Sequence, residues 1–302
     1  MGREVVAAAF NIGKLGIWSW LDSSSYTEAT EFAAATEAMG YTALWVPEAV
    51  GRDPFVMLAH LSAATKDLYL ATGIANIYAR DAMAMKSARH AVDELSGGRL
   101  VLGLGVSHAE MVSGLRQHEY QGPLTAMRGY LEQMEQALYV PALPQRSGPV
   151  LLGALRDRML GLAAAAADGA HPYFVTPEHT ARARKILGPD KLLAPEQKVL
   201  TIREPGPARS VARQHMATYL GLPNYRNNLL TLGFVAEDFE HGGSNRLVDA
   251  IVAWGDEHTI MARIEEHWQA GADHVALQCL RHDGEPGFEM DTVRAFAPRN
   301  GG

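Results

Sequence analysis

The sequence predicts an α/β fold, a (β/α)8 TIM barrel. Residues 1–302 are expected to form a single domain. Eight short apolar runs alternate with segments of helical periodicity, over a length typical of such barrels. In the central unit the apolar runs Leu68–Ala75 and Leu100–Val106 flank the helical segment Ala82–Leu95. Continuous apolar runs are typical of parallel strands buried on both faces. A doubly wound parallel sheet is the alternative fold for the same elements.

The N-terminal half has clear start and stop signals for each helix. Ser25 and Glu28 form a capping-box pattern, and Gly40 ends the helix that they open. Asp53 and Pro54 are an N-cap and first-turn pair for a helix that continues to Thr65. The strands expected here are Leu15–Trp20, Ala43–Val46, Leu68–Ala75 and Leu100–Val106.

The C-terminal half continues the alternation, but it contains more helix than a simple barrel needs. The strands expected here are Val150–Ala154, Ala170–Val175, Lys198–Ile202 and Asp273–Leu280. Helical segments are expected at 124–138, 156–167, 176–187, 208–220, 226–233, 244–254, 256–270 and 290–297. The excess is interpreted as a helical insertion around residues 204–255.

Composition excludes several classes of protein. The formal net charge is −7 and no basic stripe is visible, which argues against a nucleic-acid partner. No apolar run reaches the length of a membrane span, and residues 1–10 lack the long apolar core of a signal peptide. The single cysteine, Cys279, rules out a disulfide framework within the chain. A cytoplasmic protein is therefore expected.

Ionisable residues follow two of the expected strands, where ligands bind in α/β folds. Glu48 lies just after Ala43–Val46, and His108 follows Leu100–Val106. At the carboxyl ends of neighbouring strands, these two side chains are candidates for a proton acceptor or donor. The alternative interpretation is that each is an ordinary solvated loop residue.

The segment Gly103–His108 resembles two short motifs, neither completely. It begins like a dinucleotide fingerprint but lacks the last glycine. Residues Gly105–Ala109 approach the G-x-S-x-G pattern, which would make Ser107 the nucleophile of a serine hydrolase with a later histidine as base. The histidines available for that role are His171, His179 and His258. No zinc-binding pattern is present, so no metal site is expected.

Gly153 and Ala154 end a strand, and Arg156 and Arg158 fall in the first turn of the helix that follows. Positive side chains oppose the helix dipole there unless an anion is near. Free backbone N–H groups beside arginine are typical of phosphate sites, so this end of the sheet is a candidate anion site. Solvent-facing arginines are the alternative.

Four segments together resemble the bacterial luciferase-like family. They are ATGIANIYARD at Ala71–Asp81, SGGRLVLGLGVSH at Ser96–His108, LLGAL at Leu151–Leu155 and ADGAHPYFVTPEHT at Ala167–Thr180. Within that family the sequence is most similar to the branch of oxidoreductases that use the deazaflavin coenzyme F420. The resemblance implies a (β/α)8 barrel with insertions, a homodimer, and F420 at the C-terminal mouth of the barrel, with FMN as the alternative cofactor.

The resemblance also implies roles for individual residues. A bulge in the third strand, with a cis peptide bond at Gly73–Ile74, would lie behind the cofactor ring, and Trp18 and Trp20 would wall the substrate side. Glu48 stands where many relatives have a histidine, and Arg156-Asp157 replaces an expected Gly-Pro. The cofactor-binding residues implied are Gly73, Ile74, Ala75, Asn76, Gly105, Ser107, Gly153, Ala154, Arg158, Met159, Tyr173, Phe174, Val175 and Thr176.

Three functions are compatible with these observations. The first is an F420-dependent oxidoreductase that transfers a hydride between F420 and a small organic substrate, with Glu48 and His108 managing one proton. The second is an FMN-dependent monooxygenase that needs a partner flavin reductase. The third is a barrel that binds a cofactor or ligand without turnover.

Overall fold

The computed structural model describes residues 10–298, and all of its strands belong to one parallel sheet with the order β10-β9-β11-β1-β2-β3-β5-β6-β7-β8. A further short strand, β4, pairs with β5. The strands are β1 (Leu15–Trp18), β2 (Ala43–Val46), β3 (Tyr69–Thr72), β4 (Ala75–Asn76), β5 (Leu100–Gly105), β6 (Val150–Leu152), β7 (Gly169–Ala170), β8 (Leu192–Leu193), β9 (Glu196–Leu200), β10 (Val252–Trp254) and β11 (Val275–Cys279).

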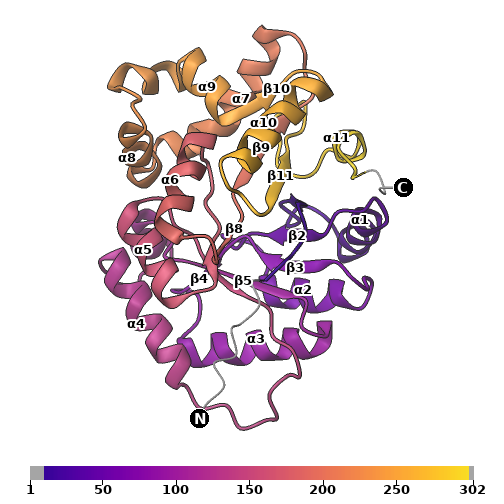
Figure 1. Cartoon of the computed structure of the whole chain (residues 1–302), viewed down its shortest axis with the longest axis vertical. Helices are drawn as coiled ribbons and strands as arrows, with labels where there is room; N and C mark the ends of the chain where they lie inside the picture. Colours follow the sequence, from indigo (N-terminus) through magenta and orange to yellow (C-terminus); the bar gives the residue numbers. More distant parts are fainter. Residues whose placement is uncertain (1–9, 299–302) are drawn as a thin grey trace.

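Helices follow the strands along the chain and surround the sheet (Figure 1). In the barrel part, neighbouring helices contact one another in chain order, from α2 to α6. The helical elements are α1 (Tyr26–Ala38), α2 (Pro54–Ser62), α3 (Ala82–Ser96), η1 (Glu110–Leu115), α4 (Pro123–Gln136), α5 (Asp157–Ala166), α6 (Pro177–Leu187), α7 (Pro205–Leu220), α8 (Pro223–Thr231), η2 (Ala236–Gly242), α9 (Asn245–Ile251), α10 (Glu257–Gln269) and α11 (Met290–Ala295).

The segment Leu192–Leu200 closes the sheet into a barrel. Its first part, β8, pairs with β7, and its second part, β9, pairs with β11. Between these parts, the N–H of Glu196 donates to the carbonyl of Pro172, and the N–H of Ala276 donates to the carbonyl of Pro195. One stretch of chain therefore joins the two ends of the sheet, and the (β/α)8 barrel prediction is confirmed over the doubly wound alternative.

Alternate strand residues belong to two separate apolar clusters, as the period of two in a strand requires. Leu44 and Val46 belong to the cluster between the sheet and its helices, while Ala43 and Trp45 belong to a smaller one inside the barrel. The other buried members of the interior cluster are Trp18, branched aliphatic residues and alanines, and Trp45 is completely buried. The interior is thus packed below the carboxyl ends of the strands.

A bulge interrupts the third barrel strand. Leu70 pairs with Leu100 and Ala75 pairs with Leu104, so five steps along one strand face four steps along β5. The hydroxyl of Thr72 bridges the break, because it donates to the Gly103 carbonyl at 2.7 Å and accepts from the Gly103 N–H at 2.8 Å. The expected bulge is present.

The prediction of a cis peptide bond at Gly73–Ile74 is wrong, because the structure has no cis bond among the described residues. The trans arrangement satisfies the backbone on both sides of this bond. The N–H of Gly73 donates to the Val46 carbonyl at 2.8 Å, and the carbonyl of Ile74 accepts from the Glu48 N–H at 3.2 Å. The bulge is thereby tied to the end of β2.

Three other expectations differ from the structure. Strand Ala170–Val175 is reduced to β7, because Pro172 has no N–H to donate and Phe174 has a φ of +62°. Helix 244–254 ends early, since Val252–Trp254 pairs with β9 as β10. The expected loop after His108 contains the short π-helix η1.

The extra helices of the C-terminal half gather at one end of the molecule. In Figure 1, α7, α8 and α9 lie at the top, while α3 and α4 lie at the opposite end. These helices have their own apolar cluster, which also includes Phe174 and Leu280 from the ends of barrel strands. Among residues 10–298, no helix has the length and apolar character needed to cross a membrane.

Substitution of Gly169 should test the closure of the barrel. A Cβ added at Gly169 would lie 1.9 Å from the backbone oxygen of Leu192 in β8, so we expect Gly169→Ala to lower the free energy of unfolding by about 1–3 kcal/mol. Gly129→Ala, inside α4 with nothing within 4 Å, should raise it by about 0.5–1 kcal/mol. Urea unfolding of both variants measures this, and equal effects would contradict the closure.

Candidate active site

A cavity of about 300 Å³ lies at the carboxyl ends of the barrel strands. Strand-end residues make up its floor and sides, and residues of α7 and α8 cover part of it. The cavity is lined by Trp18, Trp20, Pro47, Glu48, Ala49, Gly73, Ile74, Gly105, Val106, Ser107, His108, Met111, Gly153, Ala154, Leu155, His171, Tyr173, Thr218, Tyr219, Leu222, Asn224 and Tyr225.

Glycines on two strands make room for the bulge residue Ile74. A Cβ added at Gly105 would lie 1.8 Å from Cδ1 of Ile74, and one added at Gly153 would lie 3.3 Å from its Cγ2. On the other side, a Cβ at Gly73 would lie 2.5 Å from the indole nitrogen of Trp18. The floor of the cavity is therefore a smooth surface of backbone and one aliphatic side chain, a shape that suits the face of a flat ring.

Glu48 is held in place by the residues that follow the bulge. Its carboxylate accepts from the N–H of Asn76 at 2.7 Å and from the guanidinium of Arg80, which contacts both of its oxygens. Arg80 also contacts Asp53 at 3.0 Å. Burial disfavours the charged guanidinium, but these carboxylates outweigh it and raise the pKa of Arg80. Glu48 faces the cavity as one half of an ion pair.

Five aromatic side chains wall the cavity: Trp18, Trp20, Tyr173, Tyr219 and Tyr225. Trp18 and Trp20 meet edge to face at 5.7 Å between ring centroids, and Trp18 lies 5.0 Å from Tyr173. The Tyr173 hydroxyl lies 2.7 Å from that of Tyr219 and donates to Gln278 at 2.9 Å. Such pairs hold their geometry firmly, so the wall is preorganised.

A buried ion pair lies behind this aromatic wall. Nζ of Lys198 is 2.8 and 2.9 Å from the Glu196 oxygens and 3.8 Å from the centre of the Tyr173 ring. A Glu196 oxygen also accepts from the N–H of Phe174, the residue with positive φ. Burial raises the pKa of Glu196 and lowers that of Lys198. The pair fixes the turn that carries Tyr173.

Both histidines of the cavity favour their neutral form. Burial lowers the pKa of His108, with Glu110 opposing the shift. Burial also lowers the pKa of His171 to about 4. Nδ1 of His171 lies 2.6 Å from the Ala194 carbonyl, so this nitrogen carries the proton and Nε2 does not. The His171 ring stacks on Trp45 at 4.1 Å.

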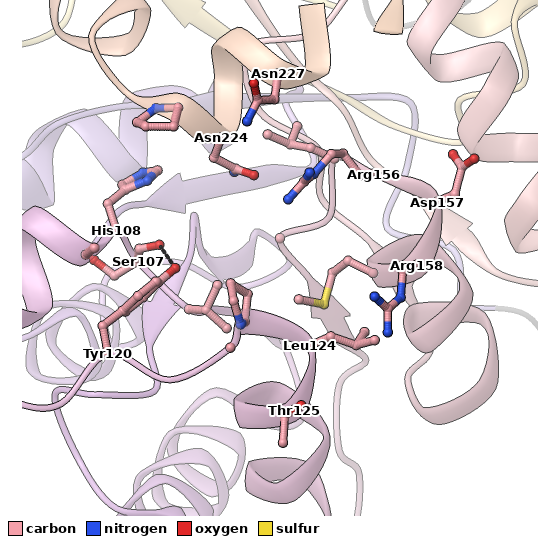
Figure 2. A pocket seen from close by; sticks show the side chains of 18 of the residues that line it. Ser107, His108, Tyr120, Leu124, Thr125, Arg156, Asp157, Arg158, Asn224 and Asn227 are labelled. Atoms are coloured by element: carbon pink, nitrogen blue, oxygen red, sulfur yellow. Dashed lines mark hydrogen bonds between the residues drawn. The ribbon is translucent and has the colours of Figure 1, made fainter.

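A second cavity, of about 640 Å³, opens beside the first and shares with it Val106, Ser107, His108, Gly153, Leu155 and Asn224. Figure 2 shows the side chains around it, with Arg156 extending into the cavity and the carboxylate of Asp157 turned away. Arg156, Arg158 and Arg182 line it, and Asp157 forms an ion pair with Arg182 at 2.8 Å. The three arginines therefore outnumber the acidic side chains in the lining of this cavity.

The structure brings most of the predicted site residues to these two cavities. Glu48, His108, Trp18, Trp20, Gly73, Ile74, Gly105, Ser107, Gly153, Ala154 and Tyr173 line the first cavity, and Arg158 and Met159 line the second.

The other predicted residues lie away from both cavities, buried behind them. Ala75 and Asn76 form β4, and the side chain of Asn76 accepts from the Tyr78 N–H. Phe174 and Val175 are 1% exposed, and Thr176 is the N-cap of α6. These five residues shape the site from behind, because the chain turns away from the mouth after the bulge and after Tyr173.

The sequence interpretation missed the residues that α7 and α8 contribute. Tyr219, Asn224 and Tyr225 line the first cavity, and Asn224 and Asn227 line the second. No short motif marks them. The segment PNYRNN follows a helix and starts with proline, which identifies a new helix start but not the face that it turns toward the barrel.

The serine hydrolase interpretation finds no support in the geometry. Ser107 has the positive φ of 55°, but among the described residues its hydroxyl has no hydrogen bond to a histidine. His171 and His179 each use a ring nitrogen on a backbone carbonyl. Within residues 10–298, no group of three or more His, Cys, Asp or Glu side chains is arranged to hold a metal ion.

Comparison with known sequences gives a family and several relatives. The sequence model described as luciferase-like monooxygenase matches residues 14–187. A Mycobacterium tuberculosis protein, named as a coenzyme F420-dependent oxidoreductase, is 29% identical over 194 residues, which are 54% of this chain and 55% of that protein. The chain's match thus spans about half the length of the curated relatives.

Solved structures with this fold include enzymes of two cofactor types. The coenzyme F420-dependent tetrahydromethanopterin reductase of Methanopyrus kandleri has a TM-score of 0.70 at 17% identity, over 96% of this chain and 98% of that one. The oxygenating constituent of 3,6-diketocamphane monooxygenase from Pseudomonas putida, in complex with FMN, has a TM-score of 0.66 at 13% identity, over 94% and 96%. At these identities the likeness concerns the fold.

A double-mutant cycle should show that Glu48 and Arg80 are coupled. We expect Glu48→Gln and Arg80→Met each to destabilise the protein, because each leaves the partner charge buried, with a coupling of about 1–3 kcal/mol in urea unfolding. The exposed pair Arg281–Asp283 is the control, and its coupling should be much smaller, because solvent screens exposed charges. Additive effects of Glu48→Gln and Arg80→Met would refute the coupling.

His171 should make the protein less stable in acid. The folded protein keeps this ring neutral down to about pH 4, whereas the unfolded chain binds the proton near pH 6.5. Between pH 7 and pH 5 this difference lowers the free energy of unfolding by about 2 kcal/mol. His171→Asn should remove that part of the pH dependence, and His118→Asn, at an exposed position, should not. Identical slopes for His171→Asn and the unsubstituted protein would disprove it.

Proposed function

Because the chain belongs to the luciferase-like monooxygenase family, we propose that it is an F420-dependent oxidoreductase that transfers a hydride between F420 and a small organic substrate. The single observation that supports this most strongly is the continuity of the two cavities. One is flat-floored and aromatic, and the other is lined by three arginines. A deazaflavin has a flat ring that suits the first cavity and an anionic tail that suits the second.

The residues present fit that cofactor. Gly73, Gly105 and Gly153 line the first cavity beside Ile74, so its floor is backbone and one aliphatic side chain, against which a flat ring can lie. Arg156 and Arg158 would hold the phosphate of the tail, since guanidinium groups bind phosphate oxygens in a planar, charge-assisted geometry. When bound, the deazaflavin would supply two-electron hydride exchange at its C5.

The protein's own part in the reaction is positioning and the control of one proton. Trp18, Tyr173 and Tyr219 would hold the substrate against the ring and exclude water from it. His108, neutral by burial, can accept a proton from the substrate and return it in the reverse direction. Glu48 would act through Arg80, because its oxygens are engaged by Asn76 and Arg80.

An FMN-dependent monooxygenase is the second candidate, favoured by the FMN-bound structure of the same fold. The tail cavity distinguishes the two candidates. FMN ends in a single phosphate, whereas F420 continues past its phosphate into a chain of carboxylates. A cavity of about 640 Å³ offers more room than one phosphate needs, and Arg156 and Arg158 line it without an ion-pair partner among the described residues.

Titration with three cofactors tests the proposal. Fluorescence should show tight binding of F420 and weak binding of FMN. Arg158→Met should weaken F420 binding about 10-fold or more, since charge-assisted hydrogen bonds contribute about 1.5–3 kcal/mol. The same variant should leave unchanged the affinity for the phosphate-free deazaflavin riboside, which lacks the tail.

Arg294→Met on α11 is the matched control, because Arg294 lines neither cavity and pairs with Asp291 on the surface. It should bind all three compounds as the unsubstituted protein does. Tight FMN binding with weak F420 binding would replace the proposal by the monooxygenase. Binding of neither cofactor would end both proposals.

A further inference from the structure

Several polar groups around the first cavity already have partners within the protein. Glu48 is paired with Arg80 and Asn76. The hydroxyls of Tyr173 and Tyr219 bond to each other, and Tyr173 also bonds to Gln278. Such groups shape the wall but have little left to offer a ligand.

His108 and Tyr225 are different. Both line the cavity, and within residues 10–298 neither the His108 ring nor the Tyr225 hydroxyl makes a hydrogen bond. Their ring centroids are 5.5 Å apart. Polar groups in enclosed sites normally find a partner. These two adjacent groups are therefore available to a ligand. Nε2 of His171 and the side chains of Ser107, Thr218 and Asn224 also line the cavity without a hydrogen bond among the described residues.

The Tyr225 ring is held firmly although its hydroxyl is free. It meets Tyr219 edge to face at 5.5 Å, with an interplanar angle of 87°, and Phe174 at 5.4 Å with an angle of 62°. Burial raises the pKa of Tyr225, so its hydroxyl keeps its proton. The ring is thus a fixed support for one hydrogen-bond donor.

The lining of the first cavity carries no uncompensated charge. The carboxylate of Glu48 is matched by Arg80, and the histidines favour the neutral form. Behind the wall, Lys198 is matched by Glu196. An ionic substrate group would lose its hydration here without meeting a counter-charge, which costs several kcal/mol.

We propose that Tyr225 and His108 together bind the oxygen of an uncharged alcohol or ketone substrate, Tyr225 as a hydrogen-bond donor and His108 as the proton acceptor. This inference rests on the proposed function for its chemistry. In alcohol oxidation the O–H bond breaks and its proton goes to a ring nitrogen of His108. The C–H bond breaks as a hydride, whose two electrons go to oxidised deazaflavin, and a C=O bond forms. Ketone reduction is the reverse.

Binding of three probes of similar size tests this without turnover: cyclohexanol, cyclohexanone and cyclohexanecarboxylate. Saturation-transfer NMR on the protein with and without F420 should show binding of the two neutral probes, and at least tenfold weaker binding of the carboxylate. Tyr225→Phe should weaken cyclohexanone binding about two- to tenfold, the loss expected for one neutral hydrogen bond. Tyr26→Phe, on α1 outside the cavities, makes the same chemical change and should have no effect.

His108→Asn is a second variant, because it replaces the proton-accepting ring by an amide that does not titrate and leaves Tyr225 in place. It should also weaken cyclohexanol binding, and with F420 it should abolish the acid limb of the pH profile for cyclohexanol oxidation. Equal binding of the carboxylate, no binding of either neutral probe, or unchanged cyclohexanone affinity in Tyr225→Phe would overturn the inference. Failure of F420 to bind, with the probe selectivity intact, would instead remove the proposed function and leave the oxygen site.

Discussion

The bulge between β3 and β4 is the constraint on which the site depends. The extra residue pushes Ile74 into the barrel mouth, and only glycine at position 105 leaves the space that it fills, while a side chain at Gly153 would contact it closely. The backbone of Glu48 bonds to Ile74, and its carboxylate bonds to Asn76 just beyond. The end of β2 therefore clamps the bulge on both sides, with Arg80 balancing the charge.

Two further devices prepare the mouth for a ligand. The Lys198–Glu196 pair fixes the turn at Phe174 and places Tyr173 in the wall, so a costly buried ion pair serves geometry more than stability. Two arginines of the second cavity, Arg156 and Arg158, lie at the start of α5, and the third, Arg182, lies in α6. Two adjoining cavities result, one walled by aromatic side chains and the other lined by arginines.

Sequence patterns predict the barrel well because its strands are continuous apolar runs and its helices have clear caps, such as Ser25 and Asp53. They also point to Glu48, His108 and the glycines, which lie at or near strand ends and line the first cavity in the structure. Sequence patterns fail where contacts between residues distant in the sequence determine the secondary structure. Val252–Trp254 becomes a strand only because β9 lies beside it, and the π-helix η1 has no sequence signature. In the sequence Tyr225 cannot be distinguished from an aromatic residue of the core, and only the fold shows that it lies at the barrel mouth.

The origin of the two sides of the first cavity has an evolutionary consequence. The floor comes from barrel strands within the segment that the family shares, whereas Tyr219 and Tyr225 come from helices of the C-terminal insertion. Mutations in α7 and α8 can therefore accumulate without disturbing the floor, because the two sides have separate apolar cores. A lineage could in this way diversify what it recognises while inheriting one unchanged reaction platform.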